Sequence, residues 1–146
     1  MDSANSHIEQ QMTTLLRRVQ WIHISTSSGS LELDRSAYGI MARLADDGPQ
    51  RLGALASAFG LDPSTITRQV QSLERAGLAT RDTDPSDRRA SILQLTEEGC
   101  DVLERTRAHR RERLEAVLAD WSDTDRVEFG RLLSLFNESM DSLLGR

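Results

Sequence analysis

Apolar residues recur at helical spacing near the start of the chain. Five of them follow one another at intervals of four, three, four and three residues: Ile8, Met12, Leu15, Val19 and Ile22. This is the spacing of a helix that packs against another helix. The pattern therefore predicts a first helix, which ends near residues 25–29, where the chain becomes a polar linker.

Two further helices are predicted between strong boundary signals. Asp34 stands at an N-cap position, and the Gly48-Pro49 pair stops the helix that follows it. A third and shorter helix starts near Leu52 and closes at Gly60.

The fourth helix follows almost at once and is strongly amphipathic. Asp62 and Pro63 offer an N-cap and a proline at the first helical position, and Gly77 is a good C-cap. One narrow apolar stripe contains Ile66, Val70 and Leu73. The opposite face carries short polar side chains and arginines: Ser64, Arg68, Gln71, Ser72 and Arg75, flanked by Thr65 and Thr67. The third and fourth helices are thus joined by a tight turn.

After Gly77 the pattern changes to short extended pieces. Leu78–Arg81 and Ser91–Leu95 have strand character, and residues 82–90, which are rich in charge, lie between them. The pattern predicts a β-hairpin with a long charged loop.

Two more helices complete the chain. Thr96 opens a long helix that ends near Trp121, and Ser122 with Asp125 resembles a capping box at the start of the last helix. The predicted fold class is therefore mainly α with a small β-hairpin: four helices, the hairpin and two helices.

A helix, a tight turn, a second amphipathic helix and a charged hairpin make up a winged helix-turn-helix. A recognition helix must fit a major groove about 12 Å wide, so short hydrogen-bonding side chains and one longer reader suit its exposed N-terminal half. The residues that meet this need are Ser64, Thr65, Thr67 and Arg68. Capping and solvation are the alternative role of the three hydroxyl residues.

Asp87, Arg88 and Arg89 occupy the predicted hairpin loop. Arginine suits a narrow minor groove, where the negative potential is strongest. An adjacent aspartate can hold a guanidinium extended through a bidentate pair. A solvated loop is the alternative, but the position between two strands, just after an amphipathic helix, favours DNA contact.

Several spaced segments follow one known pattern: Leu52–Ala56, Pro63–Arg68, Leu73–Leu78, Asp84–Arg89 and Leu95–Gly99. The last two are the most diagnostic, because they are similar to a wing signature of Asp, any residue, Arg and then Leu-Thr. On these motifs, residues 31–99 resemble the MarR family of bacterial transcriptional regulators.

The resemblance implies one domain, 1–146, with a winged helix-turn-helix lobe at 31–99 and dimerisation helices at 6–30 and 100–146. It implies a homodimer whose N- and C-terminal helices interlock and whose wings place Arg89 in the minor groove, steadied by Asp87. It also implies regulation by small phenolic or otherwise anionic ligands that bind between the dimerisation helices and the lobe. We therefore expect a ligand-responsive regulator, more often a repressor than an activator, that binds a pseudo-palindromic double-stranded DNA operator.

Three sets of candidate residues follow. The expected DNA contacts are Ser64, Thr65, Thr67, Arg68, Gln71, Arg75, Asp87, Arg88 and Arg89. The effector pocket is expected near Arg17, Trp21, His23 and Tyr38, with core packing as the alternative for Trp21 and Tyr38. The expected dimerisation residues are Ile8, Met12, Leu15, Val19, Phe136, Met140 and Leu143. Arg68 is the best candidate for base contact, whereas phosphate contact and helix-dipole complementarity are equal alternatives for Arg75.

Charge qualifies this interpretation. The 146 residues carry 23 acidic and 18 basic side chains, a formal net charge of -5, which is unlike a generally basic DNA binder. Residues 51–96 nevertheless hold six arginines against five acids, so the DNA affinity should rest on a few placed arginines. All the basic residues are Arg, which reflects either a GC-rich genome or a need for planar bidentate donors. A second arginine cluster at 105–113 points around its whole helix, and pairing with glutamates is expected there.

Several classes of function are disfavoured. The single cysteine, Cys100, allows neither an intramolecular disulfide nor a multi-thiolate zinc site, and it fits a reducing cytoplasm. We expect no membrane span, metal or cofactor, and no phosphate loop, nucleophile elbow or catalytic His-Cys pair indicates an enzyme. The alternative function is a winged-helix module for protein contacts without specific DNA binding. The polar, arginine-bearing face of the fourth helix argues against it.

Overall fold

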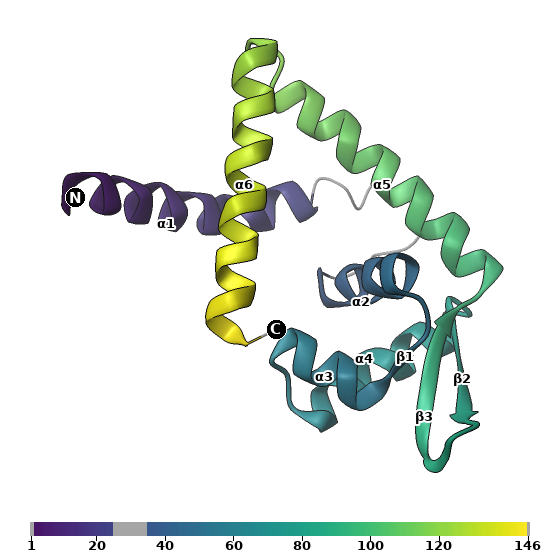
Figure 1. Cartoon of the computed structure of the whole chain (residues 1–146). Helices are drawn as coiled ribbons and strands as arrows, with labels where there is room; N and C mark the ends of the chain where they lie inside the picture. The colour runs from purple at the N-terminus through teal and green to yellow at the C-terminus, as the bar shows by residue number, and fades with distance from the viewer. Residues whose placement is uncertain (1, 25–34, 146) are drawn as a thin grey trace.

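The computed structural model describes residues 2–24 and 35–145, which form six helices and one small sheet (Figure 1). The helices are α1 (Asp2–Ile24), α2 (Arg35–Asp47), α3 (Leu52–Phe59), α4 (Pro63–Arg75), α5 (Glu97–Val117) and α6 (Asp123–Leu144). The strands are β1 (Gln50–Arg51), β2 (Ala79–Asp84) and β3 (Asp87–Leu95). The predicted fold class, mainly α with a small β-hairpin, is confirmed.

The core lies in a lobe formed by α2, α3, α4, the sheet and the first part of α5. Its most deeply buried side chains are Ile40, Met41, Leu55, Ile66, Val70, Leu73, Leu78, Leu93 and Leu103. The apolar stripe predicted for the fourth helix is therefore correct, since its three members, Ile66, Val70 and Leu73, all face this core. Because one face of α4 is buried, the opposite face is left for solvent or a ligand.

The sheet is antiparallel in the order β1-β3-β2. The long loop predicted at 82–90 is wrong, because β2 continues to Asp84 and β3 begins at Asp87, which leaves only Pro85 and Ser86 in the turn. Most side chains near the tip are exposed, so this part of the hairpin needs no apolar alternation, and its polar residues concealed the strands. The two-residue strand β1, which pairs with β3 at Ile92 and Leu93, is too short for any pattern.

Helix ends follow the predicted capping residues. The Thr96 hydroxyl oxygen accepts from the Gly99 N–H at 3.0 Å, and the Ser122 hydroxyl oxygen accepts from the Asp125 N–H at 3.1 Å. Gly77 takes a left-handed φ of 74° after α4, and the Leu78 N–H donates to the Leu73 carbonyl at 3.0 Å, which closes a Schellman motif. Asp62 stands at the N-cap of α4 but makes no side-chain cap bond.

The helices outside the lobe have little cover. No residue of α6 is buried, and the described side chains of α1 are exposed or half-exposed. Asp34, the predicted N-cap of the second helix, lies outside the described residues. No described helix combines the length and apolar character that a bilayer span requires.

Candidate DNA-binding interface

The outer face of α4 presents most of the residues that we predicted as DNA contacts. Ser64, Arg68, Gln71 and Arg75 are exposed, and Thr65 and Thr67 are half-exposed. Within the described residues, the Arg68 guanidinium makes no ion pair and no hydrogen bond. Its donors are therefore available to a base edge or a phosphate.

Thr67 is less available than its neighbours. Its hydroxyl donates to the Pro63 carbonyl one turn earlier, at 2.7 Å. This bond to the preceding turn is a role that we did not predict, since the alternatives to DNA contact were capping and solvation. To DNA, Thr67 can therefore offer its methyl group and an acceptor oxygen, while the donor remains in use inside the helix.

A bidentate ion pair fastens α4 to the wing. Arg81 on β2 donates through Nε to Glu74 Oε1 at 2.8 Å and through Nη2 to Glu74 Oε2 at 3.1 Å. Both side chains are more than two-thirds buried. No sequence motif pointed to this pair, which joins the end of the recognition helix to the start of the hairpin and so limits their relative movement.

The tip of the hairpin carries Asp87, Arg88 and Arg89, all exposed. The bidentate Asp87 pair with an arginine that we predicted is wrong: Asp87 Oδ1 instead accepts from the backbone N–H of Arg89 at 3.0 Å. The tight turn is the physical reason, because it brings that N–H directly to the carboxylate. Both tip guanidinium groups are left without a partner among the described residues.

Asp84 is the buried residue that organises the turn. Only 5% of its surface is exposed, and its Oδ1 accepts from the Ser86 N–H and the Ser86 hydroxyl, both at 2.8 Å. Its Oδ2 lies 2.5 Å from Arg51 Nη2. The Ser86 backbone N–H, followed by the Ser86 hydroxyl, lowers the pKa of Asp84 against the opposing effect of burial, and Arg51 adds to the lowering. The Asp-Pro-Ser run could have indicated an Asx turn, but no sequence signal identified Arg51 as its partner.

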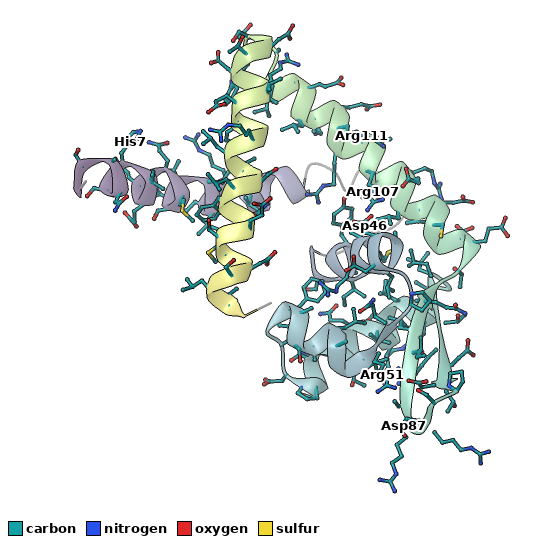
Figure 2. The ribbon with its side chains drawn as sticks, viewed as in Figure 1. His7, Asp46, Arg51, Asp87, Arg107 and Arg111 are labelled. Carbon is teal, nitrogen blue, oxygen red and sulfur yellow. The ribbon has the colours of Figure 1, made fainter. Side chains whose placement is uncertain are left out.

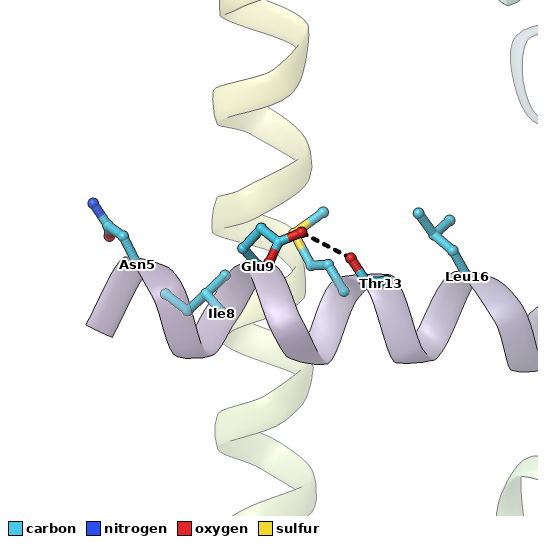
Figure 3. A pocket seen from close by; sticks show the side chains of 6 residues that line it. Asn5, Ile8, Glu9, Thr13 and Leu16 are labelled. Atoms are coloured by element: carbon cyan, nitrogen blue, oxygen red, sulfur yellow. Dashed lines mark hydrogen bonds between the residues drawn. The ribbon is translucent and has the colours of Figure 1, made fainter. Parts of the chain in front are cut away.

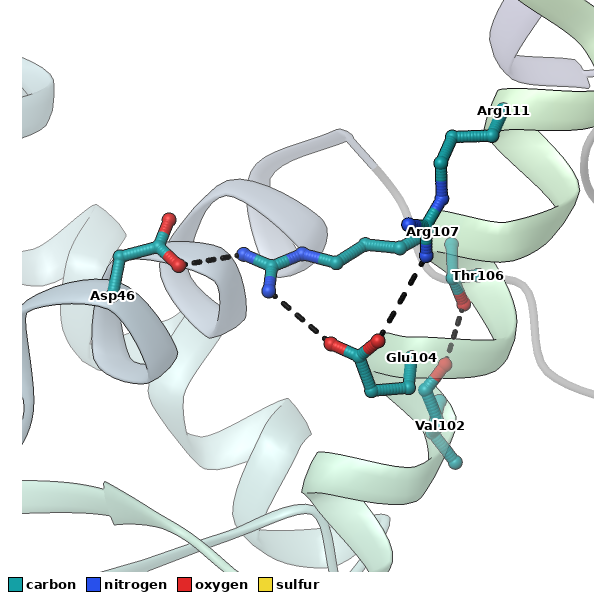
Figure 4. Close-up of polar contacts among 6 residues, drawn as sticks. All are labelled: Asp46, Val102, Glu104, Thr106, Arg107 and Arg111. Atoms are coloured by element: carbon teal, nitrogen blue, oxygen red, sulfur yellow. Dashed lines mark hydrogen bonds and ion pairs between the residues drawn. The ribbon is translucent and has the colours of Figure 1, made fainter.

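A second polar cluster joins α2 to the middle of α5 (Figure 4). Arg107 donates through Nη2 to Asp46 of α2 at 2.9 Å and through Nη1 to Glu104 at 3.3 Å. Arg111 lies 3.9 Å from the other oxygen of Glu104. The hydrogen bond to Asp46 is the main cause of the raised pKa of Arg107. Pairing of this arginine cluster with glutamates was predicted, whereas the link across to α2 was not.

The residues predicted for an effector pocket are only partly described. The Tyr38 ring is half-buried against the core, and the guanidinium carbon of Arg110 lies 4.2 Å from the ring centroid. Core packing, the alternative that we gave for Tyr38, thus accounts for part of its environment. Arg17 is exposed on α1, and the side chains of Trp21 and His23 lie outside the described residues.

The residues predicted for dimerisation lie on uncovered helical faces. Ile8, Met12 and Leu15 of α1 are exposed and Val19 is half-exposed. Figure 3 shows Ile8 and Leu16 beside a shallow hollow on α1, where the Thr13 hydroxyl donates to Glu9 at 2.9 Å. Phe136, Met140 and Leu143 of α6 are also exposed.

Comparison with known proteins decides the family. The model of the MarR family matches residues 33–91. The uncharacterised HTH-type transcriptional regulator YxaD of Bacillus subtilis is 38% identical over 133 residues, which are 90% of this chain and 92% of YxaD. The chain belongs to the MarR family. It is accordingly a DNA-binding transcriptional regulator and not an enzyme.

Other similar proteins match most of the chain. The HTH-type transcriptional repressor NicR of Pseudomonas putida is 26% identical over 97% of this chain and 90% of NicR. A MarR family protein from Bacillus stearothermophilus has the same fold, with a TM-score of 0.84, 22% identity and coverage of 96% of this chain and 97% of that chain. The regulator PcaV of Streptomyces coelicolor, solved with its natural ligand, has a TM-score of 0.66 and 28% identity over 86% of this chain and 91% of that chain.

Proposed function

We propose that this MarR family regulator is a cytoplasmic homodimeric repressor that binds a pseudo-palindromic operator and is released by a small phenolic or anionic ligand. In each subunit α4 enters a major groove and the wing tip enters the adjacent minor groove. Two such units related by a two-fold axis read half-sites about one DNA turn apart, which is the spacing of about 10 base pairs. Residues 31–99 form the DNA-binding lobe, and residues 6–30 and 100–146 carry the dimerisation helices.

The observation that carries the DNA-binding mode is the set of unpaired arginines on two neighbouring elements. Arg68 on α4 and Arg88 and Arg89 on the wing tip have no partner within the described residues, although the chain as a whole carries a net charge of -5. In an acid-rich chain an exposed arginine readily finds a carboxylate, as Arg105 and Arg131 do. Guanidinium groups left unpaired on both elements fit contact with a polyanion.

Homodimerisation is supported by the uncovered apolar residues of α1 and α6. Exposed side chains of α6 include Phe136, Met140 and Leu143, with exposed fractions of 41%, 39% and 80%. Apolar residues exposed in this number along one helix are typical of a subunit interface. A second copy of the chain is the partner that presents a matching surface under two-fold symmetry.

Ligand release is supported by the solved complex of PcaV with its natural ligand. An effector shifts the population of DNA-competent dimers only if it binds the DNA-incompetent arrangement more tightly. We place this site near Arg17, Trp21, His23 and Tyr38, because these residues come from both a dimerisation helix and the DNA-binding lobe.

Fluorescence anisotropy with a selected operator duplex and an unrelated duplex tests the DNA-binding mode. Arg68→Ala should weaken operator binding and relax the base preference, since a bidentate guanine contact is worth about 1–3 kcal/mol. Arg75→Ala should weaken both duplexes by the same factor, as expected for a phosphate contact. Arg89→Ala should lower affinity most for operators with a narrow minor groove.

Two results would overturn this proposal. One is equal affinity of the parent protein for operator and unrelated duplexes, which would favour the protein-contact alternative. The other is unchanged operator affinity in both Arg68→Ala and Arg89→Ala, with unchanged thermal midpoints, which would move the interface elsewhere.

A further inference from the structure

Arg51 is a basic residue of the lobe that no motif singled out. It lies on β1, where it is paired with Ile92 of β3, and it immediately precedes α3. Its side chain is half-exposed. Figure 2 shows Arg51 beside the hairpin, between the helices of the lobe and Asp87 at the tip.

One nitrogen of the Arg51 guanidinium has protein partners, and the other two have none within the described residues. Its Nη2 atom lies 2.5 Å from Asp84 Oδ2 and 3.2 Å from the Ser86 hydroxyl oxygen. The other two nitrogens, Nε and Nη1, make no bond within the described residues. A guanidinium carries five N–H donors, so most of them remain for a ligand.

The position of Arg51 determines what that ligand is. In B-DNA a single sugar-phosphate strand separates a major groove from the adjacent minor groove. If α4 occupies the first groove and the wing tip the second, that strand runs across the part of the lobe between them. Arg51 lies in this interval (Figure 2), where a side chain faces the sugar-phosphate strand rather than base edges.

We infer that Arg51 is a DNA-backbone ligand, which donates from its unused guanidinium N–H groups to a phosphate between the two grooves. Asp84 and Ser86 are positioning residues: they fix the side chain before DNA arrives and so reduce the rotamer entropy lost on binding. This inference rests on the proposed DNA-binding mode and adds a contact to it that is independent of base sequence.

The test measures the salt dependence of DNA binding for Arg51→Gln in the full-length protein, with the operator and an unrelated duplex. Loss of one phosphate contact per subunit should weaken binding to both duplexes by the same factor, about ten for each subunit, and it should make the slope of log affinity against log salt shallower by about 0.9 per subunit. Arg51→Lys, which keeps the charge, should retain most of the slope. Arg105→Gln, which removes an exposed arginine paired with Glu98 at 3.8 Å on α5, is the matched control and should change neither quantity.

Asp84→Asn separates phosphate contact from simple support of the wing. It removes the carboxylate but keeps Arg51, so the slope should stay at least as steep as in the parent protein. If Asp84→Asn and Arg51→Gln lose affinity equally without a change of slope, Arg51 only anchors the wing and the inference is wrong. Unchanged affinity and unchanged salt slope in Arg51→Gln also overturn the inference, even when Arg68→Ala behaves as proposed. Failure of the parent protein to bind any duplex would overturn the DNA-binding mode itself.

Discussion

Gly99 occupies a position that excludes every larger residue. It lies in the first turn of α5, where an added Cβ atom would be 2.0 Å from the carbonyl oxygen of Leu78. The same carbonyl accepts from the Thr96 N–H at 3.1 Å, while the Thr96 hydroxyl donates to the Gly77 carbonyl at 2.6 Å. The base of the wing and the start of α5 therefore meet backbone to backbone.

Gly99→Ala should destabilise the fold although alanine is the better helix former. The clash is with backbone, which cannot rotate away, so we expect the free energy of unfolding to fall by about 1–3 kcal/mol. Urea denaturation of the two proteins measures this difference. Gly53→Ala in α3 is the control, because its added Cβ meets nothing within 4 Å, and it should be neutral or stabilising by up to about 1 kcal/mol. Equal effects of the two substitutions would contradict the close approach at Leu78.

The residues that sequence could identify are those whose role depends on a local pattern. The exposed position of Arg68 follows from the apolar stripe on the other face of α4, and the cap at Thr96 follows from its place before a helix. The backbone bond of Asp87 and the pairing of Asp84 with Arg51 depend instead on a two-residue turn and on a strand 33 positions away in sequence. Contacts of this second kind carry no local periodicity.

At the level of elements, the turn end of the hairpin is held together by a buried charge rather than by apolar packing. Asp84 accepts three bonds, two from Ser86 and one from Arg51, which together lower its pKa. The folded state therefore releases the Asp84 proton more readily than the unfolded state. The resulting stabilisation is complete above the ordinary pKa of 3.8 and is lost as the pH falls below it.

Asp84→Asn should remove this pH dependence. The parent protein should be more stable than the variant near neutral pH, and the difference should shrink as the pH is lowered from about 5 to about 3. Urea midpoints of both proteins across that range provide the measurement. A stability difference that stays constant through the range would show that the Asp84 carboxylate titrates with the same pKa in the folded and unfolded states.

A second ion pair, between Arg107 and Asp46, joins α2 to α5. Arg107 and Asp46 have side-chain exposures of 27% and 63%, so solvent screens their attraction and their coupling energy should be about 0.5 kcal/mol. A double-mutant cycle with Arg107→Gln and Asp46→Asn, followed by urea denaturation, measures the coupling. It should decrease in about 1 M salt. A coupling of zero at low salt would show that the Arg107–Asp46 ion pair does not stabilise the junction of α2 with α5.

At the scale of the whole molecule, charge and apolar surface are separated. Residues 51–96 carry six arginines against five acids within a chain of net charge -5, and most of the uncovered large apolar side chains lie on α1, the end of α5 and α6. The element order was predictable because the helices are long and periodic. The homodimer remains a proposal that rests on resemblance and on these uncovered faces, since a lone amphipathic helix does not specify which surface covers it.

Met140→Glu should shift the protein from dimer to monomer, because it places a charge in the proposed interface. Sedimentation equilibrium measures the change, and operator affinity should fall with it, since one lobe alone contacts half of the site. Ser139→Glu is the control at the neighbouring position, where the hydroxyl donates to the Leu135 carbonyl at 2.8 Å. The dimeric fraction of this control should be larger than that of Met140→Glu. A dimer undisturbed by Met140→Glu would place the interface on another surface.

The length of α5 beyond its packed end has a mechanical consequence. Its 21 residues make a rod about 30 Å long at about 1.5 Å per residue, and the residues from Arg111 to Val117 are all exposed. The far end lies about 15 Å beyond Arg107, so a turn of about 10° at the Arg107 junction would move it by about 2.6 Å, which is roughly a fifth of the width of a major groove of about 12 Å. In the proposed dimer, a ligand that alters this angle would therefore change the position of one recognition helix relative to the other.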